Sequence, residues 1–551
     1  MAERELPTWL VHTATSQRYP IYSRAFASDT LPGPIGPLTA GITWVPGVLE
    51  GWRDAFVDVG AFEMSELTAE AINPVGAVIT GHAYVNHSLL QVLAVRTGVG
   101  HEVAEYLLGA ARPGAPVEMV QPIDVDESAT ERVQARLDTI AAARQVPALD
   151  ANTQLANELR AARPELSELD EGELLDRAQS LTGHVRSMVN DLVSLGVLLS
   201  PAIERLHAVA PALVLPMIGI GGDAEQTHPA SVLWRLSRLR EGSDEFVDQF
   251  LDFLRDFGSR GPQAWDPMRP SFETDPQMAM SLIEQMRGVG AERSPSARLA
   301  RVIDGRERAL EAALRAVRGD EQAIDALVVG QATALRLQLW RDDARVNCLR
   351  AINEQRVALL ELARRHLDDP GELAMLSIDE LAQFAEAPGT RAAETAGRRA
   401  GFEQLELRQP PFFVDSGAGM PTVDELPLRS PAELGDDATA SALEAGADIV
   451  GDPGAPGAAV GVARIVESPH DTDDFEVGDV LVAESLDRSL ASLLFAAGAV
   501  VCGDQEAHSY ASMVSRELGI PCVVGLRGCT RRIADGEAIY VDGTAGTVRR
   551  G

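Results

Sequence analysis

The clearest periodicity in the chain runs through residues 170–195. Apolar side chains recur there at steps of four and three residues, which places them all on one face of a helix: Leu174, Ala178, Leu181, Val185, Met188, Leu192 and Leu195. Asp170 precedes them, with Glu173 three residues further on, as in a capping box at a helix start. The spacing predicts a helix whose apolar face packs into a core, in preference to one that binds a cofactor.

A second amphipathic helix is predicted after Ser243, where aromatic residues recur every three or four positions before Gly258 stops the helix: Phe246, Phe250, Phe253 and Phe257. Arg-rich helical sequence follows from Ser296 to Leu367 and includes RDDAR at Arg341–Arg345. We therefore expect residues from about 125 to 400 to be mainly helical, with the aromatic face in a core.

The pattern changes to short strands near residue 450. Val, Ile and Ala gather in brief runs that end at Gly or Asp: GAAVGVARIV, DVLVAES, AGAVVCG, IPCVVG and EAIYVDGTAGTV. Before them, Gln409–Gly457 is rich in Pro, Gly, Asp and Ser, which predicts sparse regular structure and a hinge. The first 115 residues contain many turn signals, LPGPIGPLTAG most of all, and predict a compact mixed segment.

Charge and cysteine content narrow the choice of partners. The chain of 551 residues has 82 Asp plus Glu against 48 Lys plus Arg, a net charge of -34, so we expect neither nucleic acid nor an anionic membrane as a partner. The four cysteines show no CxxC pairing, as expected for reduced thiols without a structural zinc. No apolar run reaches the length of a membrane span and the start MAERELP does not resemble a signal peptide, so we expect a cytoplasmic protein.

The carboxyl-terminal strands occur in an order that resembles a known family. GVARIV, FEVGDVLVAESLD, AGAVVCG, MVSRELGIPCVVG and DGEAIYVDGTAGTV are similar, in order and spacing, to the swivelling phosphohistidine domain of the phosphoenolpyruvate-utilising enzymes. That family includes phosphoenolpyruvate synthase, rifampin phosphotransferase and phenylphosphate synthase. The resemblance covers about 100 residues and implies a domain that carries a phosphoryl group between two sites.

Weaker similarity continues upstream to the acceptor domain of rifampin phosphotransferase-type members. It rests on five stretches: YSRAF, LPGPIGPLT, GHAYVN, FGSRGPQAWDPMRPSFETDP and LDDPGELAMLSIDEL. The resemblance implies an α/β multidomain fold, in which a largely helical acceptor-type domain precedes a small α/β swivelling domain. The expected parts are the mixed beginning of the acceptor-type domain (1–120), its mainly helical remainder (121–408), a hinge linker (409–449) and the swivelling domain (450–551).

The ATP-grasp domain of single-chain family members is missing from this set of stretches. No GxxxxGK[ST] loop replaces it, and GIGGD at Gly219–Asp223 predicts only a turn. The resemblance therefore implies that a separate ATP-grasp subunit supplies Mg-ATP chemistry and that this chain itself needs no cofactor. The helical acceptor-type domain would bind a small hydroxylated molecule, with phenols among the candidates.

The reaction centre of the swivelling domain departs from the family pattern. AGAVV upstream and RELGIP downstream align without a gap, and this alignment puts Tyr510 where the family has its phospho-accepting histidine. The pair of family glycines becomes Gln505 and Glu506, so a negative charge stands where backbone amides would approach a phosphate. A phenol ionises near pH ~10 and forms a stable ester, so Tyr510 would be a poor relay for a phosphoryl group.

His508 lies two residues before Tyr510 and is the alternative relay, because an imidazole is nucleophilic near neutral pH. A third interpretation makes His508 an ordinary exposed turn residue. Arg516 falls where the family has an arginine in the following helix, and it would contact an anion or else serve packing.

Other reactive positions of the acceptor-type stretches differ as well. Ser259 replaces a family histidine, His82 an arginine and Phe26 an asparagine. The residues left to form an acceptor or phosphate pocket are Arg260, Asp266, Arg269, Arg341 and Arg345, for which surface ion pairing is the competing interpretation. Two hypotheses follow: a phosphotransferase subunit with an altered relay, or a non-catalytic binding, scaffolding or regulatory homologue.

Overall fold

The computed structural model describes residues 7, 9–31, 33–100, 120–214, 217, 229–261, 263–287, 290–291, 294–387, 392–428, 449–466, 475–476, 478–484, 486, 491–503, 511–512, 515–516, 519–526 and 528–550. The chain forms two compact units. The first unit comprises Met1–Pro201, Gln263–Pro270 and Leu337–Arg429, and the second comprises Ala202–Pro262, Ser271–Arg336 and Ser430–Gly551. The boundaries predicted from the sequence at residues 120, 408 and 449 stay a prediction.

The first unit combines a small sheet with many helices. Its elements are β1 (Ile21–Ser23), α1 (Ala27–Thr30), α2 (Pro37–Thr39), the π-helix η1 (Ala40–Leu49), α3 (Glu50–Asp58), α4 (Met64–Leu67), β2 (Gly76–Ile79), β3 (His82–Asn86), α5 (His87–Arg96), η2 (Pro122–Asp124), α7 (Glu127–Ala142), α8 (Pro147–Ala161), η3 (Leu166–Glu168), α9 (Glu171–Ser180), most of α10 (Thr182–His207), the later part of α16 (Glu321–Arg364), η6 (Pro370–Met375), α17 (Ile378–Glu386), α18 (Ala392–Glu406), β4 (Phe413–Asp415) and η8 (Val423–Glu425).

The predicted apolar face over residues 174–195 is confirmed as core, although it spans two helices. Asp170 and Glu173 form the predicted capping box of α9. Leu181 alone separates α9 from α10, and its φ of -74° and ψ of -17° are close to helical, so the stripe continues from one helix to the next. Its members are buried except Leu192, which is half-buried.

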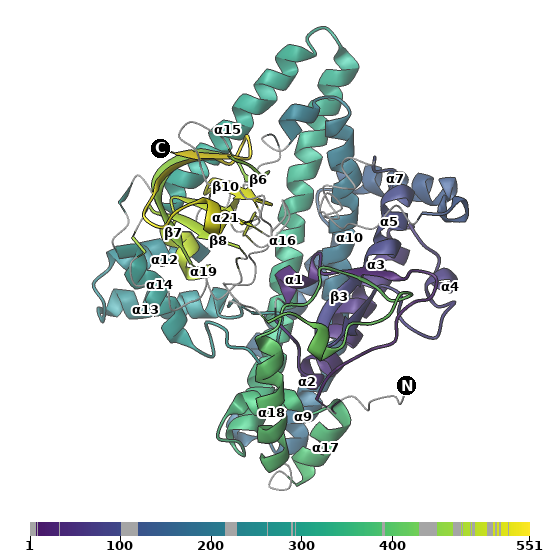
Figure 1. The fold of residues 1–551 in the computed structure, drawn as a ribbon, viewed down its shortest axis with the longest axis vertical. Helices are drawn as coiled ribbons and strands as arrows, with labels where there is room; N and C mark the ends of the chain where they lie inside the picture. The colour runs from purple at the N-terminus through teal and green to yellow at the C-terminus, as the bar shows by residue number, and fades with distance from the viewer. Residues whose placement is uncertain are drawn as a thin grey trace. The chain divides into compact units, whose positions relative to one another are not determined.

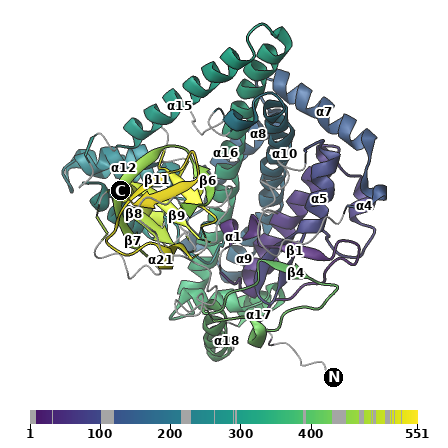
Figure 2. The same cartoon turned by 45° about the horizontal axis from the view of Figure 1, so that its top comes forward.

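The sheet of the first unit has the strand order β2-β3-β1-β4, with antiparallel neighbours throughout. Figure 2 shows β4 beside β1, although nearly 400 residues of chain separate them, and Tyr22 pairs with Val414. β4 lies within the predicted linker 409–449, where we expected sparse regular structure, and is a strand of three residues that the sequence did not predict. The apolar Phe413 and Val414 supply a strand that completes the sheet. Residues 429–448 of the linker lie outside the described residues.

The second unit joins a helical layer to a larger sheet. Its elements are the end of α10, η4 (Pro211–Leu213), α12 (Pro229–Arg238), α13 (Asp244–Phe257), α14 (Pro276–Arg287), α15 (Pro295–Ala316), the start of α16, β5 (Ile449–Val450), β6 (Asp452–Ala455), β7 (Ala458–Ile465), β8 (Val480–Ala483), α19 (Ala491–Ala496), β9 (Ala499–Cys502), β10 (Cys522–Val524), α21 (Cys529–Arg532), β11 (Ala538–Asp542) and β12 (Thr547–Arg550). The turn predicted at Gly219–Asp223 lies outside the described residues.

The predicted carboxyl-terminal strands are confirmed and form one sheet with the order β5-β12-β11-β7-β8-β9-β10-β6. β7, β8, β9 and β10 run parallel, and the remaining pairs are antiparallel. Strands that are apolar on both faces are typical of parallel sheets covered on both sides. The chain is thus an α/β multidomain protein.

The predicted aromatic helix is confirmed as α13. The Ser243 side chain caps it by accepting a hydrogen bond from the amide of Phe246, and Phe246 and Phe253 are buried. Successive rings stack along the helix, with centroids 5.9 Å apart for Phe246 and Phe250. In Figure 1, α12, α13 and α14 lie together next to α19 and the sheet. No described helix is long and apolar enough to cross a membrane.

Candidate functional site

The predicted reaction turn leaves the sheet at the carboxyl ends of two parallel strands. Ala483, the last residue of β8, pairs with Cys502, the last residue of β9, so Glu484 and Gly503 follow side by side at one sheet edge. Ligands of open α/β sheets bind at this edge. His508 and Tyr510 both lie outside the described residues, so their assignment as relay stays a prediction.

Glu484 directly follows the last residue of β8 at this sheet edge. Its carboxylate accepts hydrogen bonds from the amides of Gly528 (3.1 Å) and Thr530 (3.3 Å) and from the hydroxyl of Thr530 (3.0 Å). A β-carbon at residue 503 would meet this carboxylate, so a larger residue there would require the Glu484 side chain to shift. The amide of Gly503 also donates to the carbonyl of Ala483 at 3.0 Å. Glu484 thereby joins the end of β8 to the start of α21.

Arg516 lies in the helical segment that follows the predicted turn. Its Nε donates to the carbonyl oxygen of Gly454 in β6 at 2.6 Å, so at least one donor serves packing. A side chain at Gly454 would meet Ser512 and Cys522, which explains the close approach of β6 to this segment. Burial raises the pKa of the Cys522 thiol to about 12, so this thiol stays protonated at neutral pH. The anion-binding role of Arg516 stays a prediction.

The matched stretches YSRAF and GHAYVN come together in the first unit. Tyr22 of β1 pairs with Asn86 of β3, although more than 60 residues separate them in the chain. Arg24 is buried and donates to the carbonyls of Ala83 (2.6 Å) and Leu31 (3.0 Å), with its guanidinium carbon 5.6 Å from the centroid of the Tyr84 ring. The motif arginine thus binds backbone inside the fold.

The substituted position His82 is also buried, and its Nδ1 lies 2.9 Å from the carbonyl oxygen of Thr80. Burial raises the pKa of Tyr22 to about 12 and also raises the pKa of Tyr84, so both phenols remain neutral. Phe26, the other substituted position of these two stretches, has a positive φ of 57° and packs its ring against Trp52.

Asp266 is the centre of a second polar group in the first unit, within Gln263–Pro270. Its side chain is buried and accepts hydrogen bonds from the hydroxyl of Thr39 (2.6 Å) and the amide of Met268 (2.9 Å). Arg269 lies 3.8 Å from Asp266 and 2.6 Å from Glu406 of α18. Burial opposes the charge of Arg269, but Asp266 and Glu406 outweigh it and raise the pKa of this guanidinium. The structure therefore brings together two of the predicted binding residues.

Arg356 of α16 holds this segment in place. The side chain is completely buried, and its donors reach three carbonyl oxygens, those of Arg269 (2.7 Å), Ala264 (2.6 Å) and Asp266 (3.1 Å). A fourth bond goes from Nη1 to Oδ1 of Asn353 at 2.8 Å. Charged donors bonded to buried carbonyls fix backbone geometry strongly, because breaking them leaves unsatisfied polar groups in the interior.

The remaining predicted binding residues do not join this group. Arg345 precedes Arg356 on α16 by about 16 Å along the helix axis and pairs with Asp342 at 3.6 Å. Arg341, one turn earlier, lies against α10, since its Cδ is 3.7 Å from the place of a β-carbon at Gly196. Arg260 belongs to the second unit, where its guanidinium carbon lies 5.8 Å from the ring centroid of Phe257.

Three residues of these groups were missed from the sequence: Thr39, Arg356 and Glu484. The sequence pattern could have predicted that Arg356 is buried, because Arg356 shares a helix face with the apolar residues Ile352 and Leu360, which are both buried. A charged residue on such a face needs internal partners. Thr39 and Glu484 gave no such signal, since their partners lie far away in the chain.

Comparison with known proteins finds similarity in two parts of the chain. Residues 475–546 match the mobile domain of PEP-utilising enzymes, and residues 223–335 match the rifampicin phosphotransferase fourth domain. The first match contains β8, β9 and β10 with the edge at Gly503, and the second contains α12, α13, α14 and α15. These two parts of the chain are therefore similar to parts of phosphoenolpyruvate-utilising enzymes.

The relatives differ in the share of this chain that they match. An uncharacterised protein of Mycobacterium tuberculosis is 30% identical over 355 residues, which are 63% of this chain and 35% of that protein. An uncharacterised phosphotransferase of Bacillus subtilis is 30% identical over 33% of this chain and 21% of its own length. A probable phosphoenolpyruvate synthase of Staphylothermus marinus is 39% identical over 18% of this chain and 12% of its own length. The chain thus spans about a third of the length of the mycobacterial relative.

Proposed function

We propose that this chain is a subunit of an ATP-dependent phosphotransferase that passes phosphate to a small hydroxylated acceptor. The observation that carries the proposal is the match of residues 475–546 to a mobile domain, with the predicted turn starting at the carboxyl edge of β9. A separate ATP-grasp subunit would supply the phosphoryl group from Mg-ATP. The largely helical acceptor-type domain, which precedes the swivelling domain, would hold the acceptor, with phenols among the candidates.

His508 is the relay in this proposal. An imidazole nitrogen would attack the phosphorus as the phosphoanhydride P–O bond of the nucleotide breaks and the remaining nucleotide leaves. An acceptor hydroxyl would then lose its proton to solvent and attack the phosphorus, and the P–N bond would break to release the free imidazole. The group of Asp266, Arg269 and Arg356 supports a structured acceptor region, because one completely buried side chain holds three backbone carbonyls. Arg516 and Arg260 would contribute positive charge in the second unit, and Arg341 and Arg345 in the first.

A non-catalytic binding, scaffolding or regulatory role is the second candidate, and the substitution at Tyr510 favours it. Glu506 adds a negative charge next to the place of a phosphoryl group, and the neighbouring Glu484 carboxylate adds another at the start of the turn. Both charges oppose the approach of a dianion. This candidate keeps the fold of the family and loses the transfer.

Phosphopeptide mapping separates the two candidates. The full chain is incubated with Mg-ATP and an ATP-grasp protein, and the peptide of residues 502–516 is analysed by mass spectrometry. We expect an acid-labile phosphate that disappears in His508→Ala and persists in Tyr510→Phe. Tyr510→His serves as the positive control, because it restores the family's histidine. Labelling of Tyr510→His without labelling of the wild-type chain would establish the non-catalytic candidate.

A further inference from the structure

The sheet that carries the predicted reaction turn has two buried faces with different covers. Side chains alternate along each strand, so successive residues point to opposite faces. In β8, Val480 and Val482 belong to one core, which they share with β11, β12 and α21. Leu481 and Ala483 belong to another core, which includes buried side chains of α12, α13 and α14.

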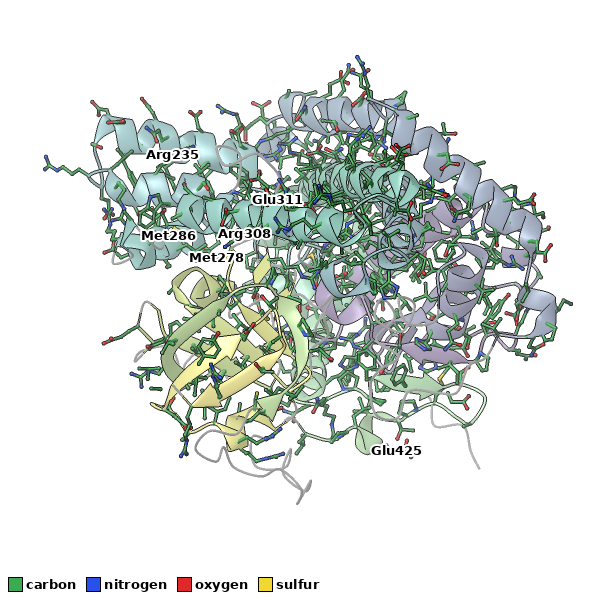
Figure 3. All side chains as sticks on the ribbon, turned by 90° about the horizontal axis from the view of Figure 1, so that it is seen from above. Arg235, Met278, Met286, Arg308, Glu311 and Glu425 are labelled. Atoms are coloured by element: carbon green, nitrogen blue, oxygen red, sulfur yellow. The ribbon has the colours of Figure 1, made fainter. Side chains whose placement is uncertain are left out.

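The second core is continuous from the sheet to the helices. On the sheet side it includes Val500, Cys502, Cys522 and Val524, together with Leu493 and Leu494 of α19. On the helix side its buried members are Ala230, Leu233, Leu236, Phe246, Phe253, Ala279, Leu282, Ile283 and Met286. α14 packs directly against α19. Figure 3 labels Met286 on α14 and shows the helical layer alongside the sheet.

Burial is complete on both sides of this contact. Leu494 of α19 is 0% exposed, and Leu236 of α12 and Ala279 of α14 are also 0% exposed. Separating the helices from the sheet would therefore uncover apolar surface on both partners, which water opposes. Domains of one chain move relative to each other by default unless their interface is large and hydrophobic. The buried apolar side chains on both sides of this contact favour the exception.

The helices themselves are tied to one another by polar bonds. Arg287, at the end of α14, donates from Nη1 to the carbonyl oxygens of Ser237 (3.0 Å) and Leu239 (3.1 Å) at the end of α12. Arg238 of α12 in turn donates to the carbonyl of Met286. The ring of Phe272 lies 5.7 Å from that of Phe253, so the loop before α14 also packs against α13. These contacts join α12, α13 and α14 to one another, so we expect the three helices to move together.

We infer that α12, α13 and α14 move together with the sheet of β8, β9 and β10, so the mobile domain of this chain does not swivel by itself. Any movement of this sheet to another site must therefore take α12, α13 and α14 along. Three helices of the region matched to the rifampicin phosphotransferase fourth domain thus pack against the sheet of the region matched to the mobile domain. The inference concerns packing and holds whether or not the chain transfers phosphate.

Spin-label distance measurements on the full-length chain test this inference. The native cysteines are all buried, so cysteines introduced at exposed positions can be labelled selectively. One label replaces Leu251 of α13, which is 58% exposed, and the other replaces Val460 of β7, which is 64% exposed. The matched control pair joins Val460 to Val450 of β5, within the sheet. We expect a single distance distribution for the helix-to-sheet pair, as narrow as that of the control pair.

A broad or two-peaked distribution for the helix-to-sheet pair, with a narrow control pair, would overturn the inference. The variant Met286→Asp adds a second arm, because it places a charge in the contact from the helix side and leaves the sheet's own residues intact. We expect it to broaden the helix-to-sheet distribution while the control pair stays narrow. An unchanged helix-to-sheet distribution in Met286→Asp would also count against the apolar contact as the cause.

Discussion

Two regions of the molecule are held in place by different forces. In the first unit, Gln263–Pro270 is fixed by hydrogen bonds from Arg356 and Thr39, with donors 2.6 to 3.1 Å from their acceptors. In the second unit, α12, α13 and α14 are joined to the sheet by buried apolar side chains. Hydrogen bonds are directional and determine where individual backbone atoms lie, whereas apolar burial is non-directional and determines only which surfaces meet. The first region is built to present particular atoms, and the second to keep two parts together.

The largest effect should come from removing the buried guanidinium. Arg356→Met leaves the carbonyls of Ala264, Asp266 and Arg269 without this donor, at about 1–3 kcal/mol each, so we expect a loss of about 5 kcal/mol in the free energy of unfolding. Chemical denaturation measures it. Arg350→Met, on the same helix and half-buried, is the control and should cost less than about 1 kcal/mol. Equal losses in the two variants would contradict the role given to Arg356.

Truncation of the apolar contact should rank second. Phe253 is 1% exposed within the second unit's core, and Phe253→Ala should cost about 4 kcal/mol through lost burial and the cavity left behind. Hydrogen exchange should quicken in α12 and α14 and remain unchanged at Gln263–Pro270. Phe250→Ala, at a half-buried position one turn away, should cost distinctly less. Faster exchange at Gln263–Pro270 in Phe253→Ala would show that the two regions are not independent.

Acid should weaken the polar interior of the first unit through His87. Burial lowers the pKa of this completely buried imidazole to about 4, and its ring packs against Phe413 at 5.1 Å between centroids. In the unfolded chain His87 is protonated below pH ~6.5, whereas in the folded chain it stays neutral down to about pH 4. The contribution of neutral His87 to the free energy of unfolding is therefore complete above pH ~6.5 and is lost as the pH falls towards 4.

The lowered pKa of His87 contributes about 3 kcal/mol to the free energy of unfolding in total. About 2 kcal/mol of this contribution should be lost between pH ~7 and pH ~5. Denaturant midpoints at the two pH values measure it. His87→Phe removes the titrating group, so its stability should change less than that of the wild-type chain over the same range. Parallel pH profiles for both proteins would rule out His87 as the source.

The smallest effect should come from a single hydroxyl. Thr39→Val deletes the donor 2.6 Å from Oδ1 of Asp266 and should cost about 2 kcal/mol, because the bond goes to a charged acceptor. Thr43→Val removes a bond of 3.1 Å to Oε1 of Gln355, a neutral acceptor, and should cost about half as much. Thermal melts of both variants give the ratio. A larger loss in Thr43→Val would argue against Asp266 as the centre of the polar group.

Much of the architecture was legible in the sequence because local patterns determine it. The stripe over residues 174–195, the capping box at Asp170 and Glu173, and the aromatic face of α13 all follow from the helical repeat, which neighbouring residues set. The carboxyl-terminal strands were predicted for the same reason. β4 was missed, because three residues in a Pro- and Gly-rich stretch become a strand only when β1 pairs with them.

The candidate site divides in the same way. The sequence by itself showed which stretches resemble the family, and it predicts that Tyr510 stands at the family's histidine position. Only the tertiary structure decided that Asp266 and Arg269 meet while Arg341 and Arg345 lie elsewhere on α16, and that Arg356 and Thr39 hold the group. It also decided that α12, α13 and α14 cover one face of the mobile domain's sheet. A run of apolar residues in a strand predicts that both faces of the sheet are buried. Which elements bury those faces is determined by contacts between residues that are distant in the chain.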